Sequence, residues 1–364
     1  MQTDQSKIDN NEMEEANMKQ MKACKWVSAA LAIAFAAATV PASAQSRPVI
    51  SVAQAGDGFQ FLTQQIAIKG GFFQKEGYDV QIADVGSGPR VVAALMGGSA
   101  IYSPLGLINL LNARERGGEL VAVASESDLI DIQLVLSNEA IKKTGITDTM
   151  STDDKIKRMK DVRISITSPG SSTDTMLRTL LKARGIETDQ AIKVLPTGGG
   201  SNMLAALEKG ANDGFVWGAP QTLLAEKKGL GKIVVDPFKG QVPEVKDVPY
   251  IVITTSMDTV KNKSKELRAS VRALTHAMKF ARENPAEAKR VARPAFAEMD
   301  DEIFNLAWDN YVKAIPATPV ISKAQFDNTK KWLDITAKQP LTVRYEDSIV
   351  NSFAEEAAAD ILKK

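Results

Sequence analysis

Short apolar runs alternate with helical patterns along most of the chain. Apolar or alternating runs of about five residues are typical of strands, and hydrophobic stripes at i, i+4 and i+7 are typical of helices. The alternation predicts an α/β protein. The runs that predict strands lie at 49–53, 78–82, 100–102, 120–124, 132–136, 162–166, 192–195, 215–217, 233–235 and 250–254.

Helical stripes fill the segments between these runs and most of the C-terminal third of the chain. Leu267, Val271, Leu274 and Met278 form one such stripe. A second unit with the same strand–helix pattern begins near residue 130 and ends near residue 250. We therefore expect two lobes with a ligand cleft between them, although periodicity alone also allows one large doubly wound domain. The expected lobes are residues 45–132 plus 248–364, and residues 133–247.

The N-terminal segment has the features of a secretory signal peptide. Lysines precede an apolar run from Trp26 to Val40, which is shorter than the roughly 20 residues that a membrane-spanning helix needs. The small-residue pattern Ala42-Ser43-Ala44 follows the run. We predict that residues 1–44 are a leader and signal peptide, cut after Ala44, and that the protein is exported to the periplasm.

Charge and composition argue against several classes of function. The 45 basic and 44 acidic residues leave a net charge of +1, which gives no electrostatic reason to expect a nucleic-acid partner. His276 and Cys24 are the single histidine and cysteine, so a typical zinc site or a disulfide framework is excluded. We expect no metal, no cofactor and no catalytic role for His276, which lies on a predicted helix away from every strand end.

Five sequence blocks, in order and in spacing, resemble periplasmic solute-binding proteins of ABC importers, specifically the nitrate/sulfonate/taurine and thiamine-precursor group. The resemblance extends from residue 48 to about residue 335. The blocks are AIKGGFFQKEGYDV at 67–80, ALMGG at 94–98, MKDVRISI at 159–166, AALEKGANDG at 205–214 and ARENPAEA at 281–288.

This resemblance implies a two-lobe periplasmic-binding-protein-like fold of type II that delivers a small-molecule solute to membrane permease and ATPase subunits. It implies a monomer and a binding protein, not an enzyme. The chain departs from the family pattern at Gly98–Ser103, which lacks an Asp, and at Gly218-Ala219-Pro220, which lacks an acid before the proline. Ligand identity therefore does not carry over.

Three functions remain open at the level of sequence. We expect a receptor for a small organic anion that is sulfonate- or carboxylate-like. A sensor subunit that docks on a receptor is the first alternative. An enzyme of thiamine-precursor type is the second, but those relatives depend on histidine and a metal, and no such cluster occurs in this sequence.

The strongest candidate site is the segment from Thr167 to Asp174, where a predicted strand ends and a helix begins. Free backbone N–H groups, hydroxyls and the helix dipole would meet there and favour an anion without a basic side chain. The alternative is that one hydroxyl only caps the helix. The candidate ligand contacts in this segment are Ser168, Ser171, Ser172 and Thr173.

Further candidates follow other predicted strands. Each has a structural alternative: helix capping or a plain turn for the Ser201–Asn202 loop, a surface ion pair for Arg90, a turn for Ser103, and core packing for the two aromatic residues. These candidates are Phe59, Arg90, Ser103, Ser201, Asn202 and Trp217.

Overall fold

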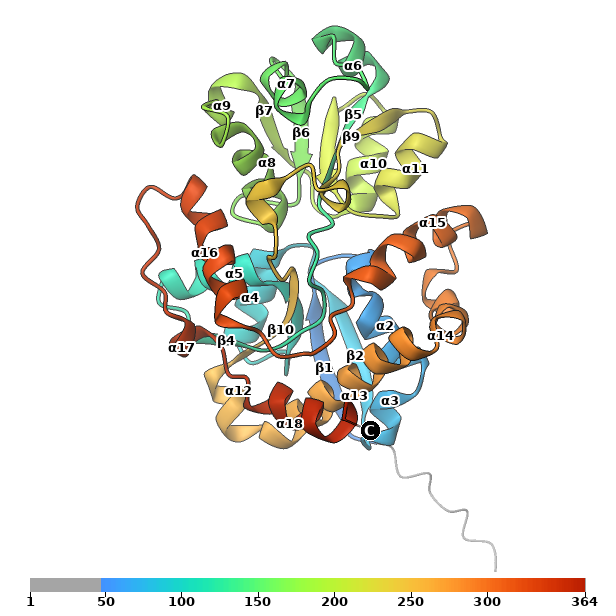
Figure 1. Ribbon diagram of the computed structural model, residues 1–364, viewed down its shortest axis with the longest axis vertical. Helices are drawn as coiled ribbons and strands as arrows, with labels where there is room; N and C mark the ends of the chain where they lie inside the picture. The colour runs from blue at the N-terminus through green and yellow to red at the C-terminus, as the bar shows by residue number, and fades with distance from the viewer. Residues whose placement is uncertain (1–46, 364) are drawn as a thin grey trace, which may run out of the picture. The chain divides into compact units, whose positions relative to one another are not determined.

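A computed structural model describes residues 47–363, and from Pro48 onward the chain forms one compact unit (Figure 1). The predicted leader and signal peptide lie outside the described residues. Within the described part of the chain, no helix combines the length and the apolar character that spanning a membrane requires.

The first sheet region, in the lower half of Figure 1, combines N-terminal strands with one late strand. Strand β1 (Val49–Gln54) pairs in parallel with β2 (Asp79–Asp84). Strand β10 (Ile251–Ser256) lies antiparallel between β3 (Ser103–Gly106) and β4 (Leu120–Ser125). A single bridge between Val52 and Tyr102 places β1 beside the start of β3.

The second sheet region, in the upper half of Figure 1, is a five-stranded sheet in the order β7-β6-β8-β5-β9. The central strand β8 pairs in parallel with β6 and antiparallel with β5. The bounds are β5 Gln133–Ser137, β6 Arg163–Ile166, β7 Lys193–Pro196, β8 Gly214–Trp217 and β9 Gly231–Val235.

Helices follow most strands in both regions. Those whose chain positions fall in the second region are α6 Asn138–Thr144, α7 Thr152–Lys157, α8 Ser172–Lys182, α9 Thr188–Ala191, α10 Gly200–Glu208 and α11 Gln221–Lys227. The others are α2 Leu62–Lys69, α3 Phe72–Lys75, α4 Gly88–Met96, α5 Leu107–Glu115, α12 Met257–Asn262, α13 Ser264–Glu283, α14 Pro285–Ala292, α15 Asp301–Tyr311, α16 Lys323–Thr336, α17 Tyr345–Ser348 and α18 Ser352–Ile361. Short 3-10 helices occur at η1 Phe59–Phe61, η2 Pro237–Lys239, η3 Pro243–Val245, η4 Arg293–Phe296 and η5 Val312–Ala314.

The predicted helical stripes are the buried faces of their helices. The stripe from Leu267 to Met278 on α13 is at most 2 % exposed, and the helix packs against α2, α3 and α18. Helix α8 buries Met176, Leu177, Leu180 and Leu181 in the same way. Burial of apolar side chains at helical spacing fixes the rotation of each helix about its axis.

One predicted strand is displaced along the sequence. The strand expected at 100–102 is Ser103–Gly106, because these four residues pair with β10 whereas Tyr102 makes one isolated bridge. Ser103 is therefore a fully buried strand residue and does not lie in the turn that was expected after a strand.

Two segments connect the sheet regions, one between β4 and β5 and the other between β9 and β10. They are hydrogen-bonded to each other, since Tyr250 N donates to Ser127 O at 2.7 Å and Glu126 N donates to Ile251 O at 2.8 Å. The two sheet regions are thus connected by two chain segments that are hydrogen-bonded to each other.

Two C-terminal helices also contact both sheet regions, on opposite sides of the connecting segments in Figure 1. Helix α16 packs on α5 and on α8, and Trp332 Nε1 donates to Thr179 Oγ1 at 2.9 Å. Helix α15 packs on η1 and on α11. The C-terminal segment therefore braces both regions, and the lobe boundaries inferred from the sequence remain a prediction.

Candidate functional site

A cavity of about 30 Å³ lies where the two sheet regions meet. None of the described residues that line it carries a formal charge. Ten residues come from the first region and its junction: Ala55, Gln60, Phe61, Gly88, Pro104, Leu105, Gly106, Asn109, Tyr250 and Ile251. Five come from the second region: Thr167, Ser171, Ser172, Thr173 and Trp217.

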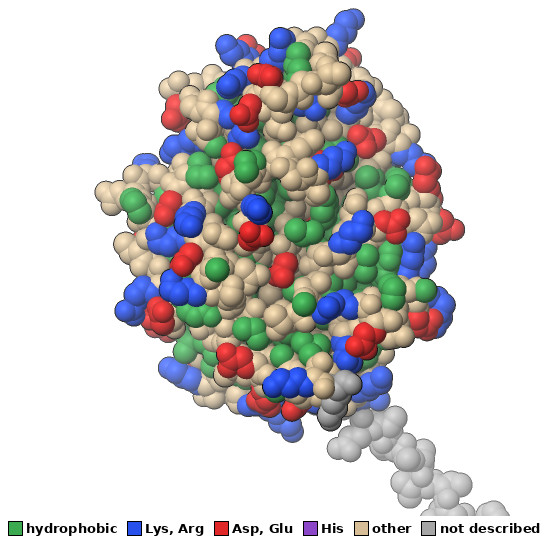
Figure 2. Space-filling model, viewed as in Figure 1, with side chains coloured by type: hydrophobic (Ala, Val, Ile, Leu, Met, Phe, Trp, Pro, Cys, Tyr) green, Lys and Arg blue, Asp and Glu red, His purple; other side chains and the backbone are tan. Residues whose placement is uncertain are grey.

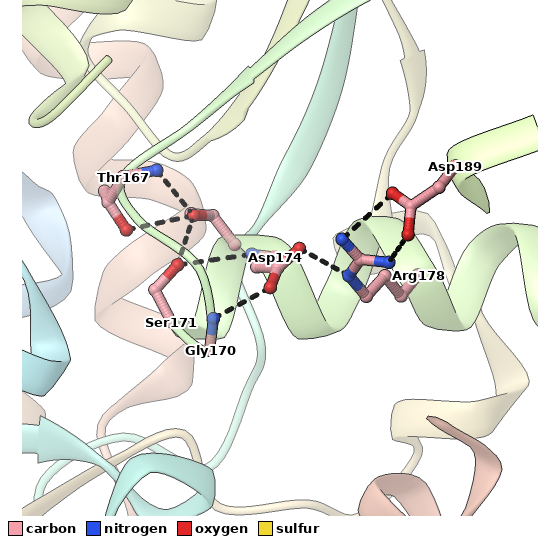
Figure 3. Close-up of polar contacts among 7 residues, drawn as sticks. Thr167, Gly170, Ser171, Asp174, Arg178 and Asp189 are labelled. Carbon is pink, nitrogen blue, oxygen red and sulfur yellow. Dashed lines mark hydrogen bonds and ion pairs between the residues drawn. The ribbon is translucent and has the colours of Figure 1, made fainter. Parts of the chain in front are cut away.

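The N-terminus of α8 supplies most of the hydroxyl groups (Figure 3). Ser171 caps the helix, because its Oγ accepts a hydrogen bond from Asp174 N at 3.3 Å. Thr173 Oγ1 accepts from Thr167 N at 3.0 Å and lies 2.9 Å from Ser171 Oγ. The buried Asp174 accepts from Gly170 N and pairs with Arg178, so its charge is balanced outside the cavity.

Ser172 makes one of the contacts between the two regions. Its Oγ accepts a hydrogen bond from Asn109 Nδ2 of α5 at 2.8 Å, and both side chains are buried. Ser172 also forms a hydrogen bond with Tyr250. Burial and the nearby charge of Asp131 raise the pKa of Tyr250, and the bond to Ser172 offsets only part of this rise. Direct polar contacts therefore join the two walls of the cavity in this structure.

Trp217 forms an aromatic wall of the cavity at the end of β8. Its indole Nε1 donates to Gln221 Oε1 at 3.0 Å, and a Cβ added at Gly200 would lie 2.2 Å from that nitrogen. The indole also lies close to Gly56 in the loop after β1. It thus contacts both sheet regions.

Ser201 and Asn202 lie in the first turn of α10 and are exposed, outside the cavity lining. Ser201 Oγ donates to Asp57 Oδ2 at 3.1 Å, and Gln221 Nε2 donates to Ser201 Oγ at 3.2 Å. This polar contact also joins the two sheet regions, next to the wall formed by Trp217.

Phe59 lies in the interior and does not line the cavity. Its ring stacks on Phe296 at 4.3 Å between centroids and also contacts Phe304 and Tyr311. The aromatic residue that reaches the cavity from this loop is Phe61. Because η1 is a single helical turn, the two rings point to different sides, one to the core and the other to the cavity. The sequence Phe59-Gln60-Phe61 alone does not show which ring faces the cavity.

The remaining candidates also lie outside the lining. Arg90 is exposed in the first turn of α4. Ser103 is buried in β3, and its Oγ donates to Pro104 O at 3.3 Å, while Pro104 itself lines the cavity. Ser168 is half-buried, and its Oγ is shielded from solvent with no hydrogen-bond partner.

The structure adds three polar residues that the sequence did not single out: Gln60, Asn109 and Tyr250. Asn109 stands inside the apolar run Leu107–Leu111. A polar residue within a buried stretch of helix is a sequence signal that could have identified it as a site residue. Gln60 stands between two phenylalanines, which is the same kind of signal.

Two carboxyl groups are buried in the segment that joins β4 to β5. Burial raises the pKa of Glu126 to about 8, and both of its carboxyl oxygens lack a hydrogen-bond partner. Burial raises the pKa of Asp131 to about 7, an effect that its bond from Tyr311 partly offsets. Both groups lie beside the cavity and not in its lining.

Metal-binding clusters are absent from residues 47–363, where no three His, Cys, Asp or Glu side chains lie close enough together. His276 is half-buried on α13 and stacks on Phe72 at 6.0 Å between centroids. Burial lowers its pKa, which favours the neutral form of the ring.

The sequence matches the NMT1-like family over residues 58–295, a span that includes every residue of the cavity lining except Ala55 and most of both sheet regions. The chain belongs to the NMT1-like family. A comparison with curated proteins finds no match.

Solved structures share the fold of this NMT1-like protein. A protein from Bordetella bronchiseptica RB50 aligns with 86% of this chain and 98% of its own, with a TM-score of 0.76 and 21% identity. The alkanesulfonate-binding protein SsuA from Xanthomonas axonopodis pv. citri, bound to MOPS, aligns with 85% of this chain and 100% of its own (TM-score 0.64, 14% identity). The periplasmic nitrate-binding protein NrtA from Synechocystis PCC 6803 aligns with 86% and 89% (TM-score 0.62, 17% identity). The predicted periplasmic-binding-protein-like α/β fold is confirmed.

Proposed function

We propose that this NMT1-like protein is an extracytoplasmic solute-binding protein that captures a small organic anion, sulfonate- or carboxylate-like, and delivers it to an ABC permease. The observation that carries the proposal is the cavity between the two sheet regions. Hydroxyl, amide and aromatic groups line it, and no charged side chain of residues 47–363 does. Structural relatives named as sulfonate- and nitrate-binding proteins support this function.

An anion would bind at the N-terminus of α8. The first backbone N–H groups of this 11-residue helix have no partner within the helix, and the helix dipole adds a partial positive charge. Ser171, Ser172 and Thr173 add hydroxyl donors at the same place. Charge stabilisation by such dipoles needs no lysine or arginine.

Binding would require the lobes to open. A cavity of about 30 Å³ holds about two water molecules, so a sulfonate or carboxylate enters only when the two sheet regions move apart. We propose residues 45–132 plus 248–364 and residues 133–247 as the moving lobes, with the two connecting segments as the hinge. The Asn109–Ser172 bond would then break and re-form around the ligand.

The proposed activity is binding followed by transfer, without bond chemistry. The structural relatives are mostly named as binding components, and one solved relative, DSZB, is described in complex with biphenyl-2-sulfinic acid, which is itself an organic anion. We further propose that the protein is a periplasmic monomer and that its partners are permease and ATPase subunits of the inner membrane.

A thermal-shift screen of the purified protein against sulfonates, carboxylates and inorganic anions tests the function. A ligand present at 100 times its Kd should stabilise the fold by about 2.7 kcal/mol. The same ligand should change the fluorescence of Trp217, and the Trp217→Phe variant should lose that change. A screen without any stabilising anion, or turnover of a compound that does bind, would contradict the proposal.

A further inference from the structure

Two amide side chains in the cavity have carbonyl oxygens without a hydrogen-bond donor. Gln60 is 8% exposed and Asn109 is 6% exposed, so both are more than nine-tenths buried. Gln60 Oε1 and Asn109 Oδ1 are each inaccessible to solvent and lack a partner. Both residues line the same cavity, Gln60 from η1 and Asn109 from α5.

The protein holds each amide in place. A Cβ added at Gly58 would lie 2.1 Å from Gln60 Oε1, and one added at Gly88 would lie 2.7 Å from Asn109 Cγ. Glycine at both positions lets the backbone approach each amide closely. The bond from Asn109 Nδ2 to Ser172 further fixes the orientation of the Asn109 amide.

Buried acceptors without donors destabilise a fold, and most buried polar groups in proteins are paired. Both acceptors belong to residues that line one cavity, so a molecule that binds there when the two walls separate can supply the missing donors. Nitrate, sulfate and unsubstituted sulfonates or carboxylates have only acceptors when ionised, so they leave both carbonyl groups unpaired. An ammonium group has donors, but no carboxylate lines the cavity to pair with its charge.

We infer that the ligand is a compact organic anion that also carries an uncharged hydrogen-bond donor, such as a hydroxyl or carboxamide group. Its anionic end lies at the N-terminus of α8, and its donor group faces Gln60 and Asn109. This inference rests on the proposed function, because it assigns the ligand class of the same cavity.

Matched pairs of probes test the inference by titration calorimetry. One pair is 2-hydroxyethanesulfonate and ethanesulfonate, the other is glycolate and acetate, and nitrate and 2-aminoethanesulfonate are added singly. The hydroxylated member of at least one pair should bind roughly fivefold to hundredfold more tightly than its partner, which is the usual effect of leaving a buried acceptor unpaired. Nitrate and 2-aminoethanesulfonate should bind more weakly than that hydroxylated probe.

Variants locate the preference. Gln60→Met or Asn109→Leu should reduce the difference within the pair to about twofold or less. Gln65→Met on α2 and Asn112→Leu on α5 are the matched controls, because both residues are outside the lining and should keep the full difference. If Asn109→Leu fails to fold, Gln60→Met and the comparison of probes on the unchanged protein still decide the question.

The possible failures are distinguishable. Equal or tighter binding of ethanesulfonate and acetate overturns the inference and leaves the proposed anion receptor intact. A preference for the hydroxylated probes that survives in both cavity variants also overturns the assignment to these amides. If no probe binds at millimolar concentration, both the inference and the proposed small-anion function are overturned.

Discussion

Ser171 and Ser172 are neighbours in sequence but have different structural roles. Ser171 caps α8 through the bond from Asp174 N, and its side chain also faces the cavity. Ser172 is the first residue of the helix and bonds to Asn109 of the opposite wall. A cap contributes to the stability of the unliganded fold, whereas a contact between the walls contributes mainly to the closed state.

We expect Ser171→Ala and Ser172→Ala to weaken ligand binding roughly tenfold each, because each removes a hydroxyl from the cavity. Ser171→Ala should also lower the unfolding free energy of the unliganded protein by about 1 kcal/mol, since the cap is lost. Calorimetric titration and urea unfolding give the two quantities. Normal binding by both variants would show that the hydroxyls at the start of α8 do not contact the ligand.

Glu126 is an unusual residue at the junction of the two sheet regions. Its carboxyl group is fully buried and has no donor, so the protonated form is favoured and the pKa rises from 4.5 to about 8. Between these two pKa values the folded protein holds a proton that the unfolded chain releases. The stabilisation from this group is therefore complete below pH 4.5 and is lost as the pH rises towards and beyond 8.

We accordingly expect the unfolding free energy to fall between pH 5 and pH 8.5, by an amount on the order of a few kcal/mol. The Glu126→Gln variant should show a smaller slope, and the remaining slope should come partly from Asp131, whose pKa is also raised. Urea unfolding at the two pH values measures this difference. The exposed Glu298→Gln variant is the control and should keep the original slope, and a Glu126→Gln slope equal to that of the unchanged protein would refute the argument.

At the scale of elements, the peptide of Ala219 connects four parts of the chain. Its carbonyl accepts from Phe59 N at 3.1 Å, in the loop after β1, and its N–H donates to Tyr311 Oη at 3.0 Å, at the end of α15. Tyr311 in turn donates to the buried Asp131 in the segment between β4 and β5. These bonds join the loop after β8 to the first sheet region. They lie on the α15 side of the two connecting segments, opposite α16.

Tyr311→Phe should loosen this contact, because it removes the acceptor of Ala219 N and the donor of Asp131. We expect a loss of about 1–3 kcal/mol in unfolding free energy and a larger radius of gyration of the unliganded protein in small-angle X-ray scattering. Tyr345→Phe is the matched control, since the Tyr345 hydroxyl bonds to Ile321 O in the C-terminal segment. Equal stability and equal dimensions of the two variants would show that Tyr311 does not hold the sheet regions together.

At the scale of the whole molecule, the charge distribution favours a small ligand over a polyanionic partner. Acidic and basic side chains are interspersed over the face in Figure 2, in agreement with the net charge of +1. Neither this face nor the net charge provides a basic patch for nucleic acid. Among the described residues, the lining of the proposed site consists of uncharged groups only.

Export is a property of the whole chain that can be measured directly. We expect the protein isolated from the periplasm to begin at Gln45, because the signal peptide should be cut after Ala44. Intact-mass spectrometry of the natural protein decides this. A soluble form that retains residues 18–44 would remove the argument for a periplasmic receptor.

The sequence by itself determined the order of strands and helices, because burial at a period of two or 3.6 residues is a local property of the chain. It also determined the start of α8, since Ser and Thr before an amphipathic stripe cap a helix wherever that helix lies. From this helix start the sequence predicts Ser171, Ser172 and Thr173 as site residues, and from the end of a strand it predicts Trp217. All four line the cavity.

Only the tertiary structure decided which other side chains lie opposite them. Asn109 bonds to Ser172 across 63 positions of sequence, and Phe61 lines the cavity where Phe59 was expected. Which side chains meet depends on how the two sheet regions pack against each other, and the chain crosses between these regions twice. No local pattern encodes them, because each side chain has the same sequence neighbours whether it faces the cavity or the core.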